Sequence, residues 1–512
     1  MRRLRFAPLT RPANKLLALP ALVRNLLALP ALAPSLLALS ALAMAAALGS
    51  CGDKQLVSNP PLDRLFFPTG LALRHVPAGC VGGSAGCATQ LVVASSNFDL
   101  NFSTADGGTL AVIDADAAVA AAQAAGAPSP LPLTVPGVLV GTPARIGSFA
   151  GEVAILDEES CPGWETALGR SPQALVPSRS QTALYRVDLG AAGPSCSGCA
   201  LPLDPTLADP YGVTVACGAF PLGDLGIPAP RTYAFVTFLR SPGSVGFLTR
   251  VDLAGDPAQP ATKANFTIDV VPSHSSTFDP ASTRLFVTAR YNGLGTFAPL
   301  RYITLARPDA GEFHSLNLSA TLRGLEPSGS ALSADRSRLY VGARVYDADL
   351  AVSLGARPSS DLAGALLVLD AKDASVGTVS AAPLAVVSID RGATVVRSLP
   401  RPGKRDLVVV TATDDGSLVL YDDEGGAIAQ VLALCQPQGQ SSADPQAPPP
   451  CQAGRPRLGA QPFGLAVERR GKNLARLYVG SFDRGWVNVI DIDPERPEAP
   501  PIGWWRIGQE RP

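Results

Sequence analysis

The sequence is poor in charged residues and in the residue types that helical proteins and most hydrolases depend on. Charged residues make up 17% of the 512 positions, and there are only three histidines and two methionines. Few Lys–Glu pairs stand at helical spacing, which argues against a helical protein. No C-x-x-C-H haem-attachment motif occurs, and the one G-x-S-x-G match, Gly82 to Gly86, lies in a Gly-rich stretch between two cysteines and not between a strand and a helix. These features disfavour nucleophilic hydrolysis and haem- or quinone-dependent oxidoreduction.

An excess of basic residues is also lacking. The formal net charge is −1, and residues 1–50 hold six basic residues and no acidic one. The remaining 36 basic and 43 acidic residues give residues 51–512 a net charge of −7. A mildly acidic chain has no general attraction for phosphate backbones, so we predict no nucleic-acid partner.

Glycine, proline and apolar residues dominate what remains. The chain has 49 Gly and 48 Pro, and 46% of its residues are hydrophobic. This composition is typical of many short strands joined by many turns, with ample material for a core.

The first fifty residues have the pattern of an export signal and are left out of the fold prediction. A basic stretch precedes an uncharged apolar segment from Leu36 to Ala47, which ends in Leu48-Gly49-Ser50-Cys51. Arg24 and several prolines interrupt the apolar run, so no stretch reaches the ~20 residues of a membrane-spanning helix.

The four residues ending at Cys51 resemble the lipobox of bacterial lipoproteins. Small residues fit the cleavage site of the signal peptidase, and the cysteine thiol accepts the lipid. The resemblance implies a signal peptide at 1–50, a lipidated Cys51 and a tether at 51–61. It also implies a membrane anchor at the cell envelope, and Gly52 in place of Asp favours the outer membrane.

Eight cysteines remain beside Cys51, an even number that suits disulfides in an oxidising compartment. Cys80 and Cys87 lie close together, as do Cys435 and Cys451, and we expect each pair to close a loop. The partners of Cys161, Cys196, Cys199 and Cys217 stay open. Cys196-Ser-Gly-Cys199 has the spacing of a redox pair or half a zinc site, but no second C-x-x-C motif occurs. Structural disulfides are the favoured interpretation.

A strand-rich unit recurs along the chain. The last copy contains Pro462-Phe-Gly-Leu-Ala-Val467, Leu477-Tyr-Val-Gly480 and Trp486-Val-Asn-Val-Ile-Asp491, and the first repeats this order from Pro68 to Asp114. In each unit, the glycine after proline predicts a tight turn with positive φ, and the closing aspartate predicts a cap for the next turn. Weaker copies bring the number of units to seven. One unit cannot bury both faces of its sheet, so we predict an all-β β-propeller over residues 62–512. Seven blades are favoured, with six or eight as alternatives, and long inter-strand loops.

The sequence pattern "LYVG…VxVID", which follows a Pro-x-Gly-Leu-Ala segment, resembles the repeats of the YVTN-type β-propellers of bacterial and archaeal surface proteins. That family motif specifies a fold and carries no catalytic residues, so no catalytic residue is assigned.

Acidic and amide residues follow the "LYVG"-type strands at similar points of their units. They are Asp99, Asn101, Asp347, Asp349 and Asp483, and Asn97-Phe-Asp99 aligns with Ser481-Phe-Asp483. Such side chains could converge on the ring axis to hold a ligand or a divalent metal, or they could simply form turns. The acidic loops at 414–416 and 422–424 could bind Ca²⁺ but also suit ordinary hairpin turns.

The three histidines offer few candidate bases, and a structural role is favoured for them. His274 takes the place of a Pro-x-Gly segment and is expected in a blade turn, and His75 is expected in the loop closed by Cys80. We therefore favour a non-enzymatic binding or scaffold module for a protein or polysaccharide partner. The alternative is a lactonase-like propeller hydrolase with an axial divalent metal.

Overall fold

The structure is a computed structural model that divides into two units, Met1–Leu56 and Val57–Pro512. The residues that it describes all lie in the second unit: 59–103, 105–126, 130–222, 227–240, 246–253, 261–268, 273–289, 299–304, 313–317, 325–345, 363–372, 382–434 and 461–509. The predicted signal peptide, Cys51, Asp347, Asp349, Cys435 and Cys451 lie outside these residues.

In the described residues, six antiparallel sheets contain four strands each, in chain order, and one sheet contains five. The first sheet is β1 (Pro68–Val76), β2 (Ala88–Ser95), β3 (Gly108–Asp114) and β4 (Ala144–Ile146), with helix α2 (Ala115–Ala125) between β3 and β4. The five-stranded sheet is β5 (Ala154–Leu156), β6 (Gln173–Ser178), β7 (Ala183–Gly190), β8 (Gly193–Ser195) and β9 (Ala200–Pro202).

The remaining sheets follow the same order. They are β10 (Ala208–Leu222), β11 (Ile227–Arg240), β12 (Gly246–Asp252) and β13 (Lys263–Ile268); β14 (Ser273–Asp279), β15 (Arg284–Ala289), β16 (Pro299–Thr304) and β17 (Phe313–Asn317); β18 (Leu325–Leu332), β19 (Arg338–Val345), β20 (Ala363–Asp370) and β21 (Ala385–Ile389); β22 (Ala393–Leu399), β23 (Leu407–Ala412), β24 (Ser417–Asp422) and β25 (Ala427–Ala433); and β26 (Pro462–Arg469), β27 (Ala475–Ser481), β28 (Trp486–Ile492) and β29 (Gly503–Gly508).

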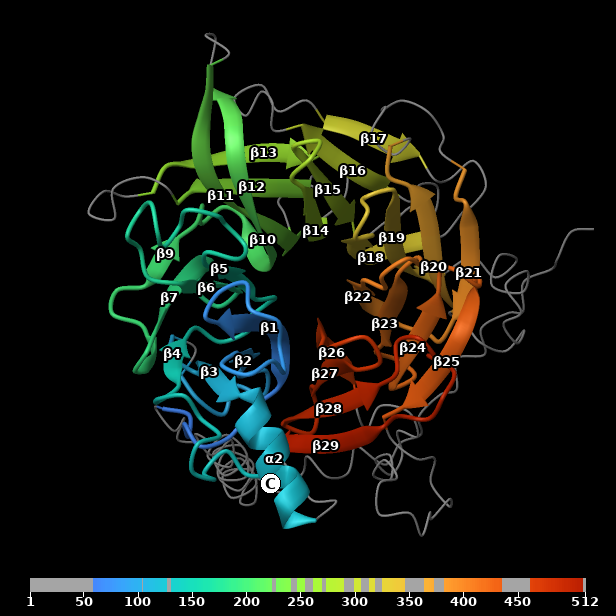
Figure 1. Ribbon diagram of the computed structural model, residues 1–512. Helices are drawn as coiled ribbons and strands as arrows, with labels where there is room; N and C mark the ends of the chain where they lie inside the picture. Colours follow the sequence, from blue (N-terminus) through green and yellow to red (C-terminus); the bar gives the residue numbers. More distant parts are fainter. Residues whose placement is uncertain are drawn as a thin grey trace, which may run out of the picture. The chain divides into compact units, whose positions relative to one another are not determined.

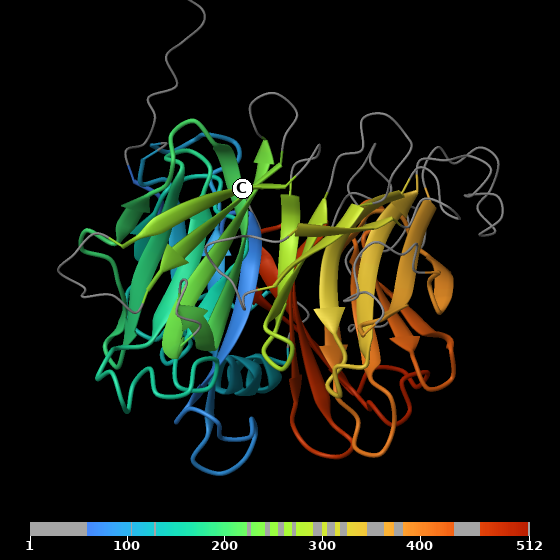
Figure 2. The same ribbon diagram turned by 90° about the horizontal axis from the view of Figure 1, so that it is seen from above.

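The sheets stand around a common axis as a β-propeller, with the first strand of each sheet innermost (Figure 1). β1 contacts β26 and β27, so the first and last sheets are neighbours and the ring closes. Seen from the side, the strands run along the axis, and α2 lies at one end of the ring (Figure 2). The predicted all-β propeller is confirmed.

The number of regular blades differs from the favoured seven. Six sheets have the regular four-stranded pattern, one fewer than predicted, and the sheet β5–β9 departs from it. In that sheet β8 and β9 are three residues long and pair with opposite ends of β7. Two short strands therefore take the place of one outer strand. The reason is local, because a Ser-Gly turn between two cysteines interrupts the chain there.

The prediction of a tight turn at each Pro-x-Gly segment is wrong. The segment is the start of the innermost strand, where the pairing register shifts between Pro68 and Gly70 and again between Pro462 and Leu465. Gly70 and Gly212 do not have positive φ. A methyl group on Gly212 would lie 2.7 Å from the His274 carbonyl oxygen, in the next sheet. Glycine is therefore required for close approach between sheets.

Buried hydroxyl groups join neighbouring sheets close to these glycines. The Thr237 hydroxyl donates to the His274 carbonyl at 2.7 Å and accepts from the Gly212 N–H at 3.0 Å. Ser96 donates to the Ala150 carbonyl at 2.9 Å, and Thr413 donates to the Pro462 carbonyl at 3.0 Å. Each bond gives a buried hydroxyl group a backbone carbonyl partner in the neighbouring sheet or in the segment that leads into it.

The aspartates that end the third strand of a repeat unit cap the following turn, as predicted, in several units. Asp114 caps helix α2 by accepting from the N–H groups of Asp116 and Ala117, and Asp370 accepts from the N–H of Lys372 at 2.8 Å. Asp491 differs, because both of its carboxylate oxygens bind the Arg476 guanidinium.

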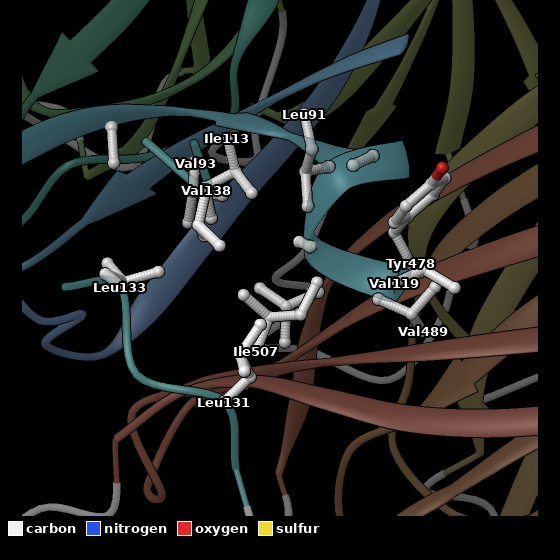
Figure 3. Close-up of a cluster of buried hydrophobic side chains, with 14 of the residues drawn as sticks. Leu91, Val93, Ile113, Val119, Leu131, Leu133, Val138, Tyr478, Val489 and Ile507 are labelled. Carbon is white, nitrogen blue, oxygen red and sulfur yellow. The ribbon is translucent and has the colours of Figure 1, made fainter. Parts of the chain in front are cut away.

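Helix α2 and the segment after it cover the junction of the first and last sheets. Leu131 forms a parallel bridge with Ile507 of β29, and its N–H donates to the Arg506 carbonyl at 2.8 Å. Val119 of the helix, Leu131 and Ile507 belong to one buried cluster with Val93 and Tyr478 (Figure 3). The cluster joins residues of both sheets, so it holds the ring closed.

Three disulfides are present in the described part of the chain: Cys80–Cys87, Cys161–Cys217 and Cys196–Cys199. The first pairing is as predicted, and the structure decides the connectivity that the sequence left open. Among the described residues, no helix is long and apolar enough to cross a membrane.

Candidate functional site

A cluster of phenylalanines gathers at one end of the ring, where the first and last sheets meet. It consists of Phe66, Phe67, Phe98, Phe102, Phe149, Phe463 and Phe482, and we call it the phenylalanine cluster. The rings of Phe98 and Phe482 lie 4.9 Å apart at 72°, and Phe98 contacts Phe149 edge-on at 5.1 Å. Phe98, Phe149, Phe463 and Phe482 are each partly exposed. Aromatic side chains held at a partly exposed surface are typical of binding sites.

Strand register explains why these rings meet. Pro68 pairs with Ser95 and Pro462 pairs with Ser481, so the residues before the inner strand and after the second strand lie at the same end of each sheet. Ring closure then brings Phe98 of the first sheet beside Phe482 of the last sheet.

Asn97 fixes the loop that carries Phe98. It is fully buried, its amide nitrogen donates to the Phe102 carbonyl at 2.9 Å and to the Ser148 hydroxyl at 3.0 Å, and its oxygen accepts from the Phe102 N–H. These bonds hold the loop closed over residues 97–102, so Asn97 positions Phe98 and Phe102.

Three of the predicted ligand residues, Asp99, Asn101 and Asp483, lie in the described part of the chain. Asp99 and Asn101 are both exposed and bind each other, with the Asn101 amide nitrogen 2.5 Å from Asp99 Oδ2. Asp483 is partly buried in the corresponding loop of the last sheet. No group of three or more His, Cys, Asp or Glu side chains suited to a metal ion occurs in the described part of the chain. The phenylalanines that precede the two aligned aspartates, Phe98 and Phe482, contact each other.

A leucine and a group of charged side chains flank the phenylalanine cluster. Leu100 is 41% exposed and has a φ of 53°. The Arg179 guanidinium lies 5.7 Å from the ring centre of Phe149, and Asp209 is 3.3 Å from Arg179 and 3.6 Å from the exposed Arg240. The surface therefore combines apolar contact area with a charged rim.

A second group of polar side chains lies around the ring axis. The rings of Tyr211 in β10 and His274 in β14 contact each other with centres 4.9 Å apart and planes tilted by 43°, and Glu152 Oε1 is 3.4 Å from the Ser275 hydroxyl. Arg397 comes from β22, on the opposite side of the ring from β5 (Figure 1). Burial raises the pKa of Glu152 and lowers the pKa of Arg397, while their mutual attraction opposes both shifts. The axis is therefore charged, with one carboxylate facing one guanidinium.

His274 is not in a blade turn. It lies within β14 and is 2% exposed, because the segment that replaces Pro-x-Gly is itself part of the inner strand. The sequence offered no signal for its contact with Tyr211, since the two residues belong to different sheets.

His75 is also placed differently from the prediction. It lies in β1, before the loop closed by Cys80 and Cys87, and its two ring nitrogens lie 3.0 Å from Glu159 and 3.2 Å from Glu468. Hydrogen bonds with Glu159 and Glu468 raise the pKa of His75 to about 10. The imidazolium thus links the first sheet to the last sheet and to the loop after β5.

The acidic loops that could have held Ca²⁺ pair with arginines. Asp414 and Asp415 bind Arg344 and Arg391. Asp422 and Asp423 bind Arg401 and Arg338 beside a cavity of about 560 Å³ that is lined mainly by charged residues. These carboxylates already have cationic partners.

Comparisons with known proteins identify the fold. The sequence matches no protein-family model and no curated protein. One similar structure is Kuenenia stuttgartiensis hydrazine synthase, with a TM-score of 0.50, 11% identity, and 83% of this chain and 96% of that chain covered.

Two further similar structures have lower scores. The β-propeller domain of Myceliophteria thermophila Cps50 (Swd1) has a TM-score of 0.44, 9% identity and coverage of 83% and 96%. A putative 6-phosphogluconolactonase from Bacteroides uniformis has a TM-score of 0.39, 12% identity and coverage of 68% and 91%. At 11% identity, the likeness to hydrazine synthase extends to the fold alone.

Proposed function

We propose that this chain is an envelope lipoprotein whose propeller binds a protein or polysaccharide partner through the phenylalanine cluster. The observation that carries the proposal is the partial exposure of Phe98, Phe149, Phe463 and Phe482 at one end of a rigid ring. Aromatic side chains supply large contact areas with little loss of conformational entropy, and Arg179 and Arg240 provide a charged rim.

The lipoprotein part of the proposal depends on Leu48-Gly49-Ser50-Cys51. Three disulfides in the folded unit suit an oxidising compartment outside the cytoplasm. Mass spectrometry of the mature protein should find diacylated Cys51 as the N-terminal residue. Gly52 should direct the mature protein to the outer membrane. Cys51→Ala should leave an unprocessed precursor without lipid. A mature chain that begins elsewhere would refute the anchor.

The binding surface is tested by Leu100→Asn. This change removes an exposed apolar side chain beside Phe98 and suits the positive φ at that position. The variant should fold as stably as the wild type and lose at least tenfold in affinity for the partner, measured by quantitative cross-linking in envelope extracts and on glycan arrays.

Leu168→Asn is the matched control. Leu168 is 48% exposed on the loop between β5 and β6, away from the phenylalanine cluster. Equal binding by the wild type and both variants would exclude the phenylalanine cluster as the binding surface.

The second candidate is a lactonase-like hydrolase with an axial divalent metal. The buried Glu152 and the neighbouring Tyr211 and His274 favour a chemically active axis. Elemental analysis of the purified chain decides between the two. One tightly bound divalent ion per chain, whose removal by chelator lowers the melting temperature, would support the hydrolase, and variants at Asp99, Asp483 and Glu152 would then locate the metal.

A further inference from the structure

The three disulfides differ in burial and in the length of chain that they close. Cys161–Cys217 spans 56 residues; Cys161 lies in a buried cluster with Trp164 and Phe238, and Cys217 is partly exposed at the edge of that cluster. Cys196–Cys199 spans three residues, and both of its cysteines are partly exposed. In the chain-entropy model, a cross-link over a short loop restricts the unfolded chain much less than one over a long loop. Opening Cys196–Cys199 therefore costs less folding stability than opening Cys161–Cys217.

Attack on this disulfide is sterically open. Ser195, Ser197, Gly198 and Ala200 are all exposed, and a methyl group on Gly198 would meet no atom within 4 Å. A thiolate must approach a disulfide sulfur closely, so accessibility decides which disulfides exchange.

The surrounding ladder does not depend on the disulfide. β8 pairs with β7 over Asp188–Gly190, and β9 pairs with β7 over Ala183–Tyr185. The Cys199 carbonyl also accepts from the Arg186 N–H at 2.9 Å. These bonds anchor the chain on both sides of the Ser-Gly turn, so the sheet remains paired when the two sulfurs separate.

We propose that Cys196–Cys199 is a redox-exchangeable site that a protein dithiol, of the thiol–disulfide oxidoreductase class, opens and closes while the ring stays folded. A thiolate of the dithiol attacks one cysteine sulfur, breaks the Sγ–Sγ bond and forms a mixed disulfide, and the released sulfur takes up a proton. The second thiolate of the dithiol then attacks the mixed disulfide and releases the other cysteine, which takes up a second proton. The chain gains two electrons and two protons, and the dithiol becomes a disulfide.

The test equilibrates the purified, oxidised full-length exported chain with glutathione redox buffers. Acid quenching, alkylation and peptide mapping then report each disulfide separately. Cys196–Cys199 should open at a value of [GSH]²/[GSSG] at least tenfold lower than Cys161–Cys217 requires. Circular dichroism and tryptophan emission should not change at that point.

A pair of single substitutions tests the exchange step. Cys199→Ser should accumulate a glutathione mixed disulfide on Cys196, because the thiol that would resolve it is missing. Cys217→Ser leaves Cys161 buried, and that cysteine should stay unmodified in the folded chain. The proposal is overturned if Cys196–Cys199 resists reduction as strongly as Cys161–Cys217, or if it opens only together with loss of the tertiary signal. Both of these titration results are measured on the wild type, so they do not depend on whether either variant folds.

Discussion

Ring closure through the cluster under helix α2 is the feature whose energetics the structure defines best. Ile507 of β29 is fully buried in that cluster, whereas Ile502, five positions earlier, is 59% exposed. We expect Ile507→Ala to weaken the junction of the first and last sheets and Ile502→Ala to leave it unchanged. The two substitutions remove the same atoms from the same stretch of chain, so each serves as the reference for the other.

The magnitude follows from burial. Replacing isoleucine by alanine deletes three carbons, and at about 0.8 kcal/mol per buried methylene this removes roughly 2.4 kcal/mol of transfer free energy. A residual cavity of about 40 Å³ would add roughly 1 kcal/mol. Ile507→Ala should therefore lower the free energy of unfolding by about 3 kcal/mol, and Ile502→Ala should lower it by less than about 0.5 kcal/mol.

Urea unfolding followed by circular dichroism and tryptophan emission measures both variants. Three of the four tryptophans, Trp486, Trp504 and Trp505, lie in the last sheet, so emission reports mainly on that sheet. Hydrogen exchange should rise most in β1–β4 and β26–β29. Equal urea midpoints for the two variants, or a rise in exchange spread evenly over all sheets, would refute the assignment of ring closure to this cluster.

Two other contacts give separate predictions. The pKa of His75 is raised from 6.5 to about 10, so its stabilising effect is complete below pH 6.5 and is lost as the pH rises toward 10. The urea midpoint of the wild type should fall between pH 7 and pH 10 more than that of His75→Gln, and parallel curves would contradict this. Thr237→Val should cost about 1–3 kcal/mol, because it removes the buried hydroxyl that bonds both the His274 carbonyl and the Gly212 N–H. Thr237→Ser keeps the hydroxyl and should lower the free energy of unfolding clearly less in the same assay. Equal losses for the two variants would mean that the packing of the threonine methyl group, and not its hydroxyl, stabilises the fold.

The local patterns in the sequence were informative where structure depends on near neighbours. Apolar runs of strand length ending in aspartate predicted the sheets, and Asp114 and Asp370 cap the following turns as expected. The cysteines at 80 and 87 are close in the chain, and their disulfide was predicted from that spacing. The one-residue bulge within the Pro-x-Gly segment was not predictable from near neighbours. Pro-x-Gly was therefore predicted to form a turn, whereas it begins an inner strand.

The sequence by itself determined the class of the fold, because strand length, turn residues and repeat spacing are properties of short segments. The tertiary structure alone decided which distant residues form the candidate site. Phe98 meets Phe482 and Glu152 faces Arg397 because the ring closes, and closure joins units that are far apart in the chain. The physical reason is that each sheet buries its faces against its neighbours. The residues that share the axis or the junction are therefore set by the packing of the whole ring, not by any one unit.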